Sequence, residues 1–343
     1  MRYFDDTACS RHPIPMSEPV DSPPREFGGY FELEVFEGSV FHDDAVSLNT
    51  GRNALGYVLE ARGIERILLP DYLCDSVVEV CDRFGVQVGR YPIGRDLRPL
   101  ELPDVGAEEW LYVVNYFGQL SDAEQNSLAR VYPRLIIDNT QSFFTRPLRG
   151  VDTLYTCRKF FGVADGAFLY TTSSLTRELP TDTSADSMAH VLGRFENQAS
   201  LYHPKYRESE KRLIGRPLAR MSRVTANLLR AVDFERAARR RRANFAVLHD
   251  RLGARNLLAD VVADAGPYHY PLVVEDGESV LPQLHRRGVF APRLWPDVLT
   301  DEVAGTVARD LARDLIPVPV DHRYSSEDMA IVADRVEEAF DAV

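Results

Sequence analysis

LIIDNTQ (residues 135–141) and YTCRKFFG (residues 155–162) are the two stretches that decide the fold of this 343-residue chain. The first is an apolar run that ends on Asp138, as expected at the carboxyl end of a buried strand. The second sets Lys159 among apolar neighbours, where desolvation beside the Arg158 charge would lower the pKa of the amine. A nucleophilic amine that follows a buried acid indicates an enzyme.

Short apolar segments alternate with amphipathic segments around these stretches. Helical spacing begins near Ala54 and again near Val77, and each helical segment is followed by a short apolar segment suited to a strand. Strands separated by helices predict βαβ units and a mostly parallel sheet, so we expect an α/β chain. The expected strands are 67–69, 86–88, 110–114, 135–137 and 167–170.

The second half of the chain has a different pattern. A long helix is expected from Ala219 to Leu252, because apolar residues there form one stripe at helical spacing. The elements expected beyond it are a strand at 268–274, a short helix at 280–287 and a final helix that begins at the capping sequence SSED, residues 325–328. The domains expected from these patterns are a flexible, proline-containing N-terminal tail at 1–27, a large domain at 28–235 and a small C-terminal α+β domain at 236–343.

The composition limits the possible functions. A formal net charge of −12 and a sequence pI of about 5.2 argue against a nucleic-acid partner, which would need a basic face. No apolar run approaches the roughly 20 residues that cross a bilayer, so we expect no membrane association. The scattered histidines lack metal-ligand spacing, and the four cysteines, Cys9, Cys74, Cys81 and Cys157, lack disulfide or zinc spacing. We therefore expect reduced thiols, no metal and a soluble cytoplasmic protein.

The sequence NTGRNAL (49–55) suits the N-terminus of a helix that binds an anion. Free backbone N–H groups point outward at such an end, and Gly51 would let a phosphate approach closely. Arg52 or Asn53 could add further donors. The plainer interpretation is a capped surface helix.

The acid and the lysine also allow structural interpretations. Asp138 could cap a helix, and Lys159 could be a solvated surface charge, although its apolar flank favours a desolvated amine. Thr156 could set a hydroxyl on the same phosphate as the helix N-terminus. A lysine for a Schiff base and an acid for a ring nitrogen are what pyridoxal 5'-phosphate (PLP) chemistry needs. The basic run at 239–242 is most simply a solvated face paired with Glu235.

Five motifs follow one another along the chain: NTGRNAL (49–55), LPDY (69–72), DNTQ (138–141), TCRK (156–159) and DGA (165–167). In this order they resemble a known family, the DegT/StrS-type aminotransferases. The resemblance covers the chain from about residue 28 to its C-terminus. It implies the fold-type I architecture of PLP-dependent transferases, with a smaller C-terminal α+β domain after the central sheet. It also implies PLP as the cofactor and keto sugars carried on nucleotides as the usual substrates.

The resemblance assigns roles to individual residues. Lys159 would form the Schiff base with the cofactor, and Asp138 would pair with its pyridine nitrogen; both are therefore the expected catalytic residues. Arg52 and Asn53 stand where the family holds the phosphate through a Thr and an Ala. The full set of expected cofactor-binding residues is Gly51, Arg52, Asn53, Tyr72, Cys74, Asn115, Asp138, Gln141, Thr156 and Lys159.

Two departures from the family affect the cofactor pocket. Leu154 stands where the family more often has a Ser, so the hydroxyl moves to Thr156. Cys74 stands at the expected place of the aromatic residue that stacks on the ring, which leaves Tyr72 or Cys74 to cover it.

The leading expectation is a PLP-dependent aminotransferase. It would move an amino group from an amino acid, such as glutamate or glutamine, to a carbonyl on a nucleotide-linked keto sugar or a natural-product intermediate. The chain could instead be another PLP enzyme, such as a lyase, decarboxylase or racemase, or a non-catalytic member of the fold. The resemblance further implies a homodimer with shared active sites. The segment 194–216, which shows little periodicity, is the expected crossing loop, and an exposed loop is its plainer interpretation.

Overall fold

The computed structural model describes residues 27–258 and 260–343. The tail expected at 1–27 therefore lies outside the described residues, apart from Phe27. The chain divides into a unit at 1–34 and a larger unit at 35–343. The larger unit carries the helices and strands described below.

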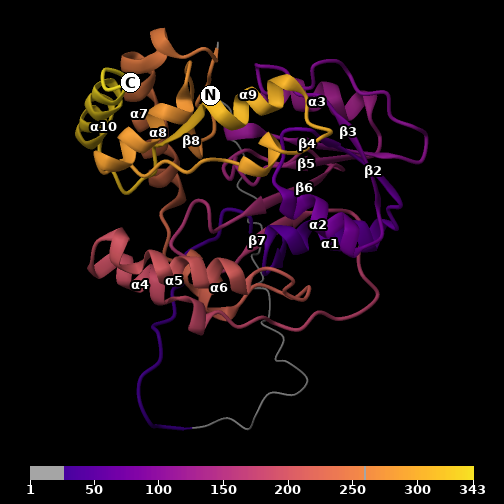
Figure 1. Cartoon of the computed structure of the whole chain (residues 1–343). Helices are drawn as coiled ribbons and strands as arrows, with labels where there is room; N and C mark the ends of the chain where they lie inside the picture. Colours follow the sequence, from indigo (N-terminus) through magenta and orange to yellow (C-terminus); the bar gives the residue numbers. More distant parts are fainter. Residues whose placement is uncertain (1–26, 259) are drawn as a thin grey trace, which may run out of the picture. The chain divides into compact units, whose positions relative to one another are not determined.

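The larger unit is built on a seven-stranded sheet with the strand order β1-β7-β6-β5-β4-β2-β3 (Figure 1). Strands β2 to β6 pair in parallel, whereas β7 is antiparallel to both β6 and β1. The expected α/β class with a mostly parallel sheet is confirmed. The strands are β1 (Val46–Leu48), β2 (Arg66–Pro70), β3 (Gln87–Tyr91), β4 (Trp110–Val114), β5 (Leu135–Asp138), β6 (Asp152–Thr156) and β7 (Ala167–Tyr170).

Three helices connect the strands of this sheet, as βαβ units require. Thr50 caps the first by accepting a hydrogen bond from the Asn53 N–H, and Gly63 ends it in the left-handed region at φ 59°. Ser121 and Glu124 form a capping box at the start of the third. The helices are α1 (Gly51–Arg62), α2 (Asp75–Arg83) and α3 (Asp122–Val131).

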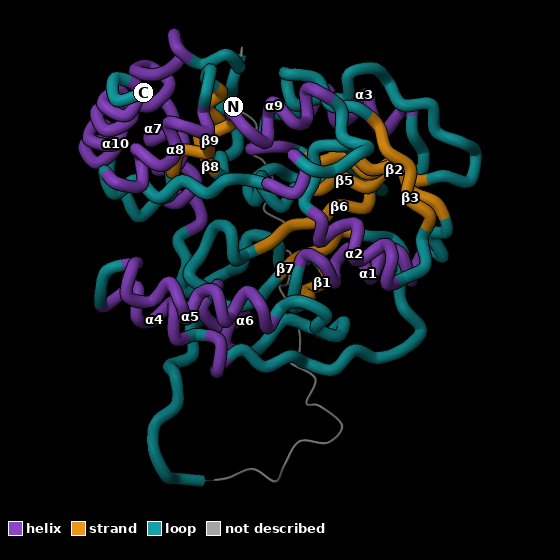
Figure 2. Tube along the Cα trace, in the orientation of Figure 1, coloured by secondary structure: helices purple, strands orange, loops and turns teal. Residues whose placement is uncertain are grey.

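The second half adds a two-stranded antiparallel sheet surrounded by helices. In Figure 2, β8 and β9 lie beside α7 and α8, and α10 packs on both of these helices. This agrees with the expected small C-terminal α+β region. The elements are α7 (Phe234–Leu252), β8 (His269–Val273), α8 (Gly277–Arg286), α9 (Thr306–Asp314), β9 (Leu315–Pro319) and α10 (Ser326–Phe340). The expected domain boundary at 235/236 stays a prediction, and it falls in the first turn of α7.

The expectation of a single helix at 219–252 is wrong. The chain forms α6 (Arg223–Leu229) and α7, and the two are separated by a turn. Asp233 caps α7 by accepting a hydrogen bond from the Arg236 N–H, and this local bond competes with a continuous helix. The apolar stripe nevertheless continues across both helices. Their buried residues, such as Leu229 and Phe234, pack in the same aromatic cluster.

The expectation of an irregular segment at 194–216 is also wrong. Most of it is helical, in α4 (Ala189–Glu196) and α5 (Ala199–Arg212), which pack against each other. Of the α5 residues, all of which the structure describes, Ser209 is the one that is buried. A helix with no buried stripe leaves no helical period in its apolar residues, and Pro204 further obscures the pattern.

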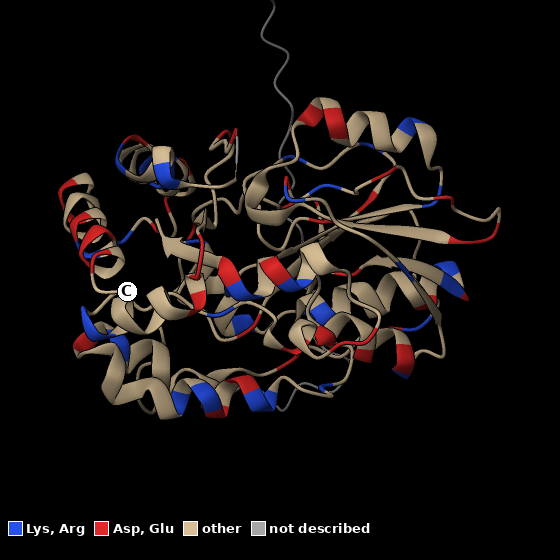
Figure 3. Cartoon of the chain, turned by 45° about the horizontal axis from the view of Figure 1, so that its top comes forward, with Lys and Arg blue, Asp and Glu red and all other residues tan. Residues whose placement is uncertain are grey.

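Short 3₁₀ turns complete the described chain at η1 (Tyr116–Gly118), η2 (Ala185–Ser187), η3 (Gly253–Arg255) and η4 (Pro296–Leu299). Acidic and basic residues are interspersed along the helices (Figure 3). Within residues 27–258 and 260–343, no helix combines the length and the apolar character that a bilayer span requires.

Candidate active site

A cavity of about 240 Å³ lies where the sheet meets the N-terminus of α1. Strands β5 and β6 are adjacent and parallel, with Asp138 opposite Leu154, so their carboxyl ends open at one edge. Ligands of parallel α/β sheets gather at that edge. The predicted site residues that line the cavity are Gly51, Arg52, Cys74, Asp138, Gln141, Thr156 and Lys159.

Lys159 follows β6 by three residues, in a turn closed by hydrogen bonds from the Phe160 and Phe161 N–H groups to the Cys157 carbonyl. Its Nζ donates to Thr140 Oγ1 at 3.0 Å. Desolvation lowers the pKa of Lys159 from its ordinary value; the charge of Asp138 opposes the shift, and Arg158 acts with it. The amine is therefore neutral, and nucleophilic, over a wider pH range than a surface lysine.

Asp138 is buried at the end of β5, and its two oxygens have different partners. Oδ1 accepts from the Thr140 N–H at 2.7 Å and closes the turn after the strand, while Oδ2 accepts from the Tyr112 hydroxyl at 2.6 Å. Burial raises the pKa of Tyr112 well above its ordinary value, and the Asp138 charge adds to the shift. Tyr112 therefore remains a hydrogen-bond donor to the carboxylate.

The N-terminus of α1 faces the same cavity. Gly51 and Arg52 line it, and the Arg52 Nε atom is buried with no hydrogen-bond partner among the described residues. Leu154 and Thr156 form the neighbouring wall, and the Thr156 hydroxyl makes only a long contact of 3.4 Å to the Gly166 carbonyl. Free N–H groups, an unsatisfied guanidinium and a weakly held hydroxyl together suit an anion.

Three predicted residues lie outside the cavity lining. Asn53 turns its amide to the Asn49 side chain and the Pro217 carbonyl, so it joins α1 to a distant loop. Asn115 donates to the Asn139 side chain and accepts from the Leu120 N–H. Tyr72 is fully buried, and its hydroxyl has no partner in the part of the chain that the structure describes.

The sequence did not reveal other residues of the cavity wall. Trp295, which lies between α8 and α9, lines the cavity at a left-handed φ of 49° and packs edge-on against Tyr72 with 4.6 Å between the ring centroids. Glu210 of α5 also lines it and pairs with Arg158. Neither residue belongs to one of the motifs that predicted the site, because both lie in segments distant in sequence from those motifs.

Arg241 corrects the expectation that the basic run at 239–242 faces solvent. Arg239 does pair with Glu235, as expected, but Arg241 is 1% exposed. Its guanidinium donates to the carbonyls of Phe160, Pro267 and Tyr268. One residue of the run therefore holds the lysine turn to the segment that enters β8.

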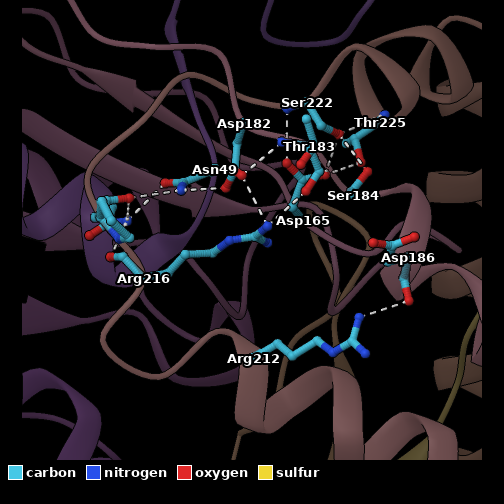
Figure 4. Close-up of polar contacts among 12 residues, drawn as sticks. Asn49, Asp165, Asp182, Thr183, Ser184, Asp186, Arg212, Arg216, Ser222 and Thr225 are labelled. Atoms are coloured by element: carbon cyan, nitrogen blue, oxygen red, sulfur yellow. Dashed lines mark hydrogen bonds and ion pairs between the residues drawn. The ribbon is translucent and has the colours of Figure 1, made fainter.

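A second polar network anchors the surroundings of the lysine turn (Figure 4). The buried carboxylate of Asp165 accepts hydrogen bonds from the Ser222 N–H and hydroxyl and from the Thr225 hydroxyl. Asp182 accepts from the Asn49 amide and pairs with Arg216. Through Asp165 the network ties the turn after Lys159 to the start of α6, and through Asp182 it ties the strand end before α1 to Arg216.

Comparison with known proteins gives matches to solved structures. No family model matches the chain, and no curated protein is similar in sequence. A DegT DnrJ EryC1 StrS aminotransferase from Brucella abortus has a TM-score of 0.57 at 13% identity over 86% of this chain and 85% of the other. Helicobacter pylori PseC, an aminotransferase involved in the biosynthesis of pseudoaminic acid, has a TM-score of 0.62 at 13% identity over 87% of each chain. NtdA from Bacillus subtilis, with bound cofactor PMP, has a TM-score of 0.60 at 14% identity over 86% of this chain and 73% of the other.

These matches confirm the fold. The chain has the fold-type I architecture, and its fold is similar to that of solved aminotransferases, one of which is a DegT DnrJ EryC1 StrS aminotransferase.

Proposed function

We propose that this protein is a PLP-dependent aminotransferase. The observation that carries the proposal is the meeting of Lys159 and Asp138 in one cavity at the carboxyl ends of β5 and β6. A desolvated amine and an oriented carboxylate on one cavity support the proposal, because this chemistry needs both groups.

The residues present fit PLP at its phosphate, its aldehyde and its pyridine nitrogen. The N-terminus of α1 and the unpaired Arg52 Nε suit the phosphate, with the Thr156 hydroxyl beside them. Lys159 suits the aldehyde, and Asp138 suits the pyridine nitrogen. When bound, PLP would act as an electron sink that makes the α-proton of an amino acid acidic.

The chain's own groups then have distinct tasks. Lys159 would hold the cofactor through Nζ, and once the donor has displaced it, Nζ would take up the α-proton and return it to the carbon two atoms away, which is a 1,3-proton shift. Thr140 orients Nζ through its hydroxyl. Asp138 would hold a proton on the ring nitrogen, and Tyr112 fixes the orientation of the carboxylate. Gln141 lines the cavity beside them.

The substrates follow from the proposed reaction. The donor would be an amino acid, glutamate or glutamine, and the acceptor a small carbonyl compound, either a nucleotide-linked keto sugar or a natural-product intermediate. PseC, which acts in the biosynthesis of pseudoaminic acid, supports a sugar acceptor. We also propose a cytoplasmic homodimer with shared active sites, in which exposed residues of the segment 194–216 contribute to the neighbouring active site, whereas Glu210 of α5 lines the cavity of its own chain.

Borohydride reduction of the purified protein, followed by peptide mass mapping, tests the site. We expect PLP on Lys159, and a label on another lysine, or none, would contradict the assignment. Lys159→Ala should fold, because Nζ makes one hydrogen bond, and should lose turnover.

Incubation with glutamate tests the reaction class. The absorption spectrum should change from the PLP form to the PMP form as the keto acid is released. An unchanged spectrum with amino-acid turnover would indicate a lyase, decarboxylase or racemase. Absence of bound cofactor would indicate a non-catalytic member of the fold.

A further inference from the structure

Arg158, the residue before Lys159, has a guanidinium whose hydrogen-bond donors are only partly paired. It lines the cavity, and its Nη2 pairs with a carboxylate oxygen of Glu210, whereas its Nε is buried and has no hydrogen-bond partner in the described chain. In the same molecule, the Arg62–Asp152 and Arg177–Glu60 pairs use Nε and Nη2 together. Arg158 therefore offers a two-donor fork of which Glu210 fills one half.

Glu210 is a replaceable partner for Arg158. It lies on α5, whose one buried residue is Ser209, and its side chain is 33% exposed, compared with 19% for Arg158. The arginine is thus fixed in the wall of the site, whereas the acid comes from a helix that buries little. The pairing also demonstrates that a carboxylate fits beside Arg158 within the cavity wall.

The observations favour a carboxylate over a phosphate at this position. The N-terminus of α1, Arg52 and Thr156 already provide donors for a phosphate on the same cavity. Arg158 provides a planar fork, the geometry that matches a carboxylate through two parallel hydrogen bonds. Each amino acid that could serve as donor brings at least one carboxylate to the neighbourhood of Lys159.

We propose that Arg158 binds a carboxylate of the amino donor through Nε and Nη2, and that Glu210 occupies this position when the donor is absent. The proposal rests on the proposed function and names the residue by which the donor is recognised. Entry of the donor exchanges one carboxylate for another on Arg158 and releases Glu210 from the cavity wall.

Glutarate is the probe, because it has two carboxylates but no amino or keto group to react. Its affinity for the holoprotein is measured by calorimetry. Arg158→Gln should weaken glutarate binding by about tenfold or more, because a charged, two-point hydrogen bond is lost. Arg158→Lys, which keeps the charge but not the fork, should weaken it less. Glu210→Gln should tighten binding several-fold, because the internal competitor is removed.

Glu208→Gln is the matched control. Glu208 lies on the same helix and pairs with Lys205 and Arg212, so its loss should leave glutarate affinity as in the wild type. Equal affinity in wild type, Glu210→Gln and Arg158→Lys would overturn the proposal even if Arg158→Gln does not fold. It would also be overturned if Arg158→Gln weakened PLP relative to pyridoxal while glutarate affinity stayed the same, because the guanidinium would then serve the cofactor phosphate.

The two proposals fail in different ways. A wild-type protein without PLP on Lys159 would contradict the proposed function. If the wild-type protein carries PLP on Lys159, but substitutions at Arg158 and Glu210 leave glutarate affinity unchanged, this inference alone is contradicted.

Discussion

The two carboxylate oxygens of Asp138 have separate hydrogen-bond partners. Oδ1 closes the turn after β5 and Oδ2 is held by Tyr112, so the carboxylate is oriented before any ligand arrives. Preorganised charge of this kind stabilises a cationic partner without further rearrangement. The structural and the chemical interpretations of this acid are therefore compatible, and a substitution that keeps its shape can separate them.

We predict that Asp138→Asn binds PLP but slows proton abstraction by orders of magnitude. The amide keeps an oxygen for the turn, yet lacks the charge that would hold a proton on the ring nitrogen. Single-turnover absorbance with glutamate measures the step, and the free energy of unfolding serves as the structural control. Nearly unchanged rates would mean that the carboxylate only closes the turn.

His42 gives a prediction about pH. It is fully buried, with Nε2 at 2.8 Å from the Phe143 carbonyl and Nδ1 at 3.1 Å from the Tyr170 hydroxyl. Burial lowers the pKa of His42 from 6.5 to about 4, although the Phe143 carbonyl opposes the shift, as Asp44 also does, while Arg146 adds to it. Between these two pH values the unfolded chain binds a proton at this residue and the folded chain does not.

The contribution of His42 to stability should thus be complete above pH 6.5 and fall as the pH drops toward 4, by up to about 3 kcal/mol. Urea unfolding at pH 7.5 and pH 5 measures the change. His42→Gln, which cannot titrate, should show a smaller loss over the same interval. An equal loss in both proteins would assign the pH dependence to other groups.

Arg241 joins α7 to the turn that carries Lys159. Its guanidinium satisfies three backbone carbonyls and lies over the Phe160 ring, 4.6 Å from the centroid. Burial lowers the pKa of Arg241 to about 10, which still leaves it cationic near neutral pH. The lysine turn therefore depends on a helix that begins 75 residues further along the chain (159 to 234).

We predict that Arg241→Met lowers the free energy of unfolding by about 2–4 kcal/mol, because buried carbonyls lose their donor. Arg239→Met is the matched control on the same helix: its exposed pair with Glu235 should contribute less than about 1 kcal/mol. Urea unfolding of both variants checks the difference. Equal effects would contradict the assigned role of Arg241.

Local patterns predicted the elements that are buried on one side or on both. The run LIID is entirely buried in β5, and SSED begins α10 with a capping box, so each could be recognised within a few residues. The helix α5 could not, since it buries almost nothing. The sequence also gives no sign that Arg241 is buried and Arg239 is exposed, because this difference arises only from the packing of Arg241 against Phe160 and the segment that enters β8.

The helices α4 and α5 carry apolar side chains that are exposed to solvent on the single chain. Phe195 is 93% exposed and Leu201 is 66% exposed, and Leu192 and Ile214 nearby are exposed as well. Exposed apolar groups gathered on one part of a surface commonly mark a protein interface. This observation supports the proposed homodimer.

We predict that light scattering at low micromolar concentration gives twice the chain mass of 38.7 kDa. Phe195→Asp should shift the protein toward the monomer, because a charge is costly to bury in an interface. Leu100→Asp is a matched control, an exposed leucine distant from α4 and α5 in sequence, and should leave the mass unchanged.

Mixing chains tests whether active sites are shared. Lys159→Ala chains mixed with chains altered in residues 194–216 should regain activity, since one site of the mixed dimer would be complete. A stable and fully active monomer would contradict the arrangement.

Sequence motifs identified one side of the candidate site and missed the other. Asp138 and Thr156 end strands of one sheet, Gly51 and Lys159 follow strands of the same sheet, and parallel topology brings such positions together. Trp295 and Glu210 reach the cavity from α+β and helical segments whose docking depends on contacts distant in sequence. Spacing along the chain carries no information about such contacts.

The position of Trp295 gives the protein an optical probe of its own. The chain contains two tryptophans, and the other, Trp110, lies at the start of β4 beside Arg62, away from the cavity lining. Replacing Trp110 with Phe would leave Trp295 as the one tryptophan fluorophore, and Trp295 lines the cavity that ligands would enter. Its emission would then report the arrival of cofactor and substrates in real time, without any attached dye.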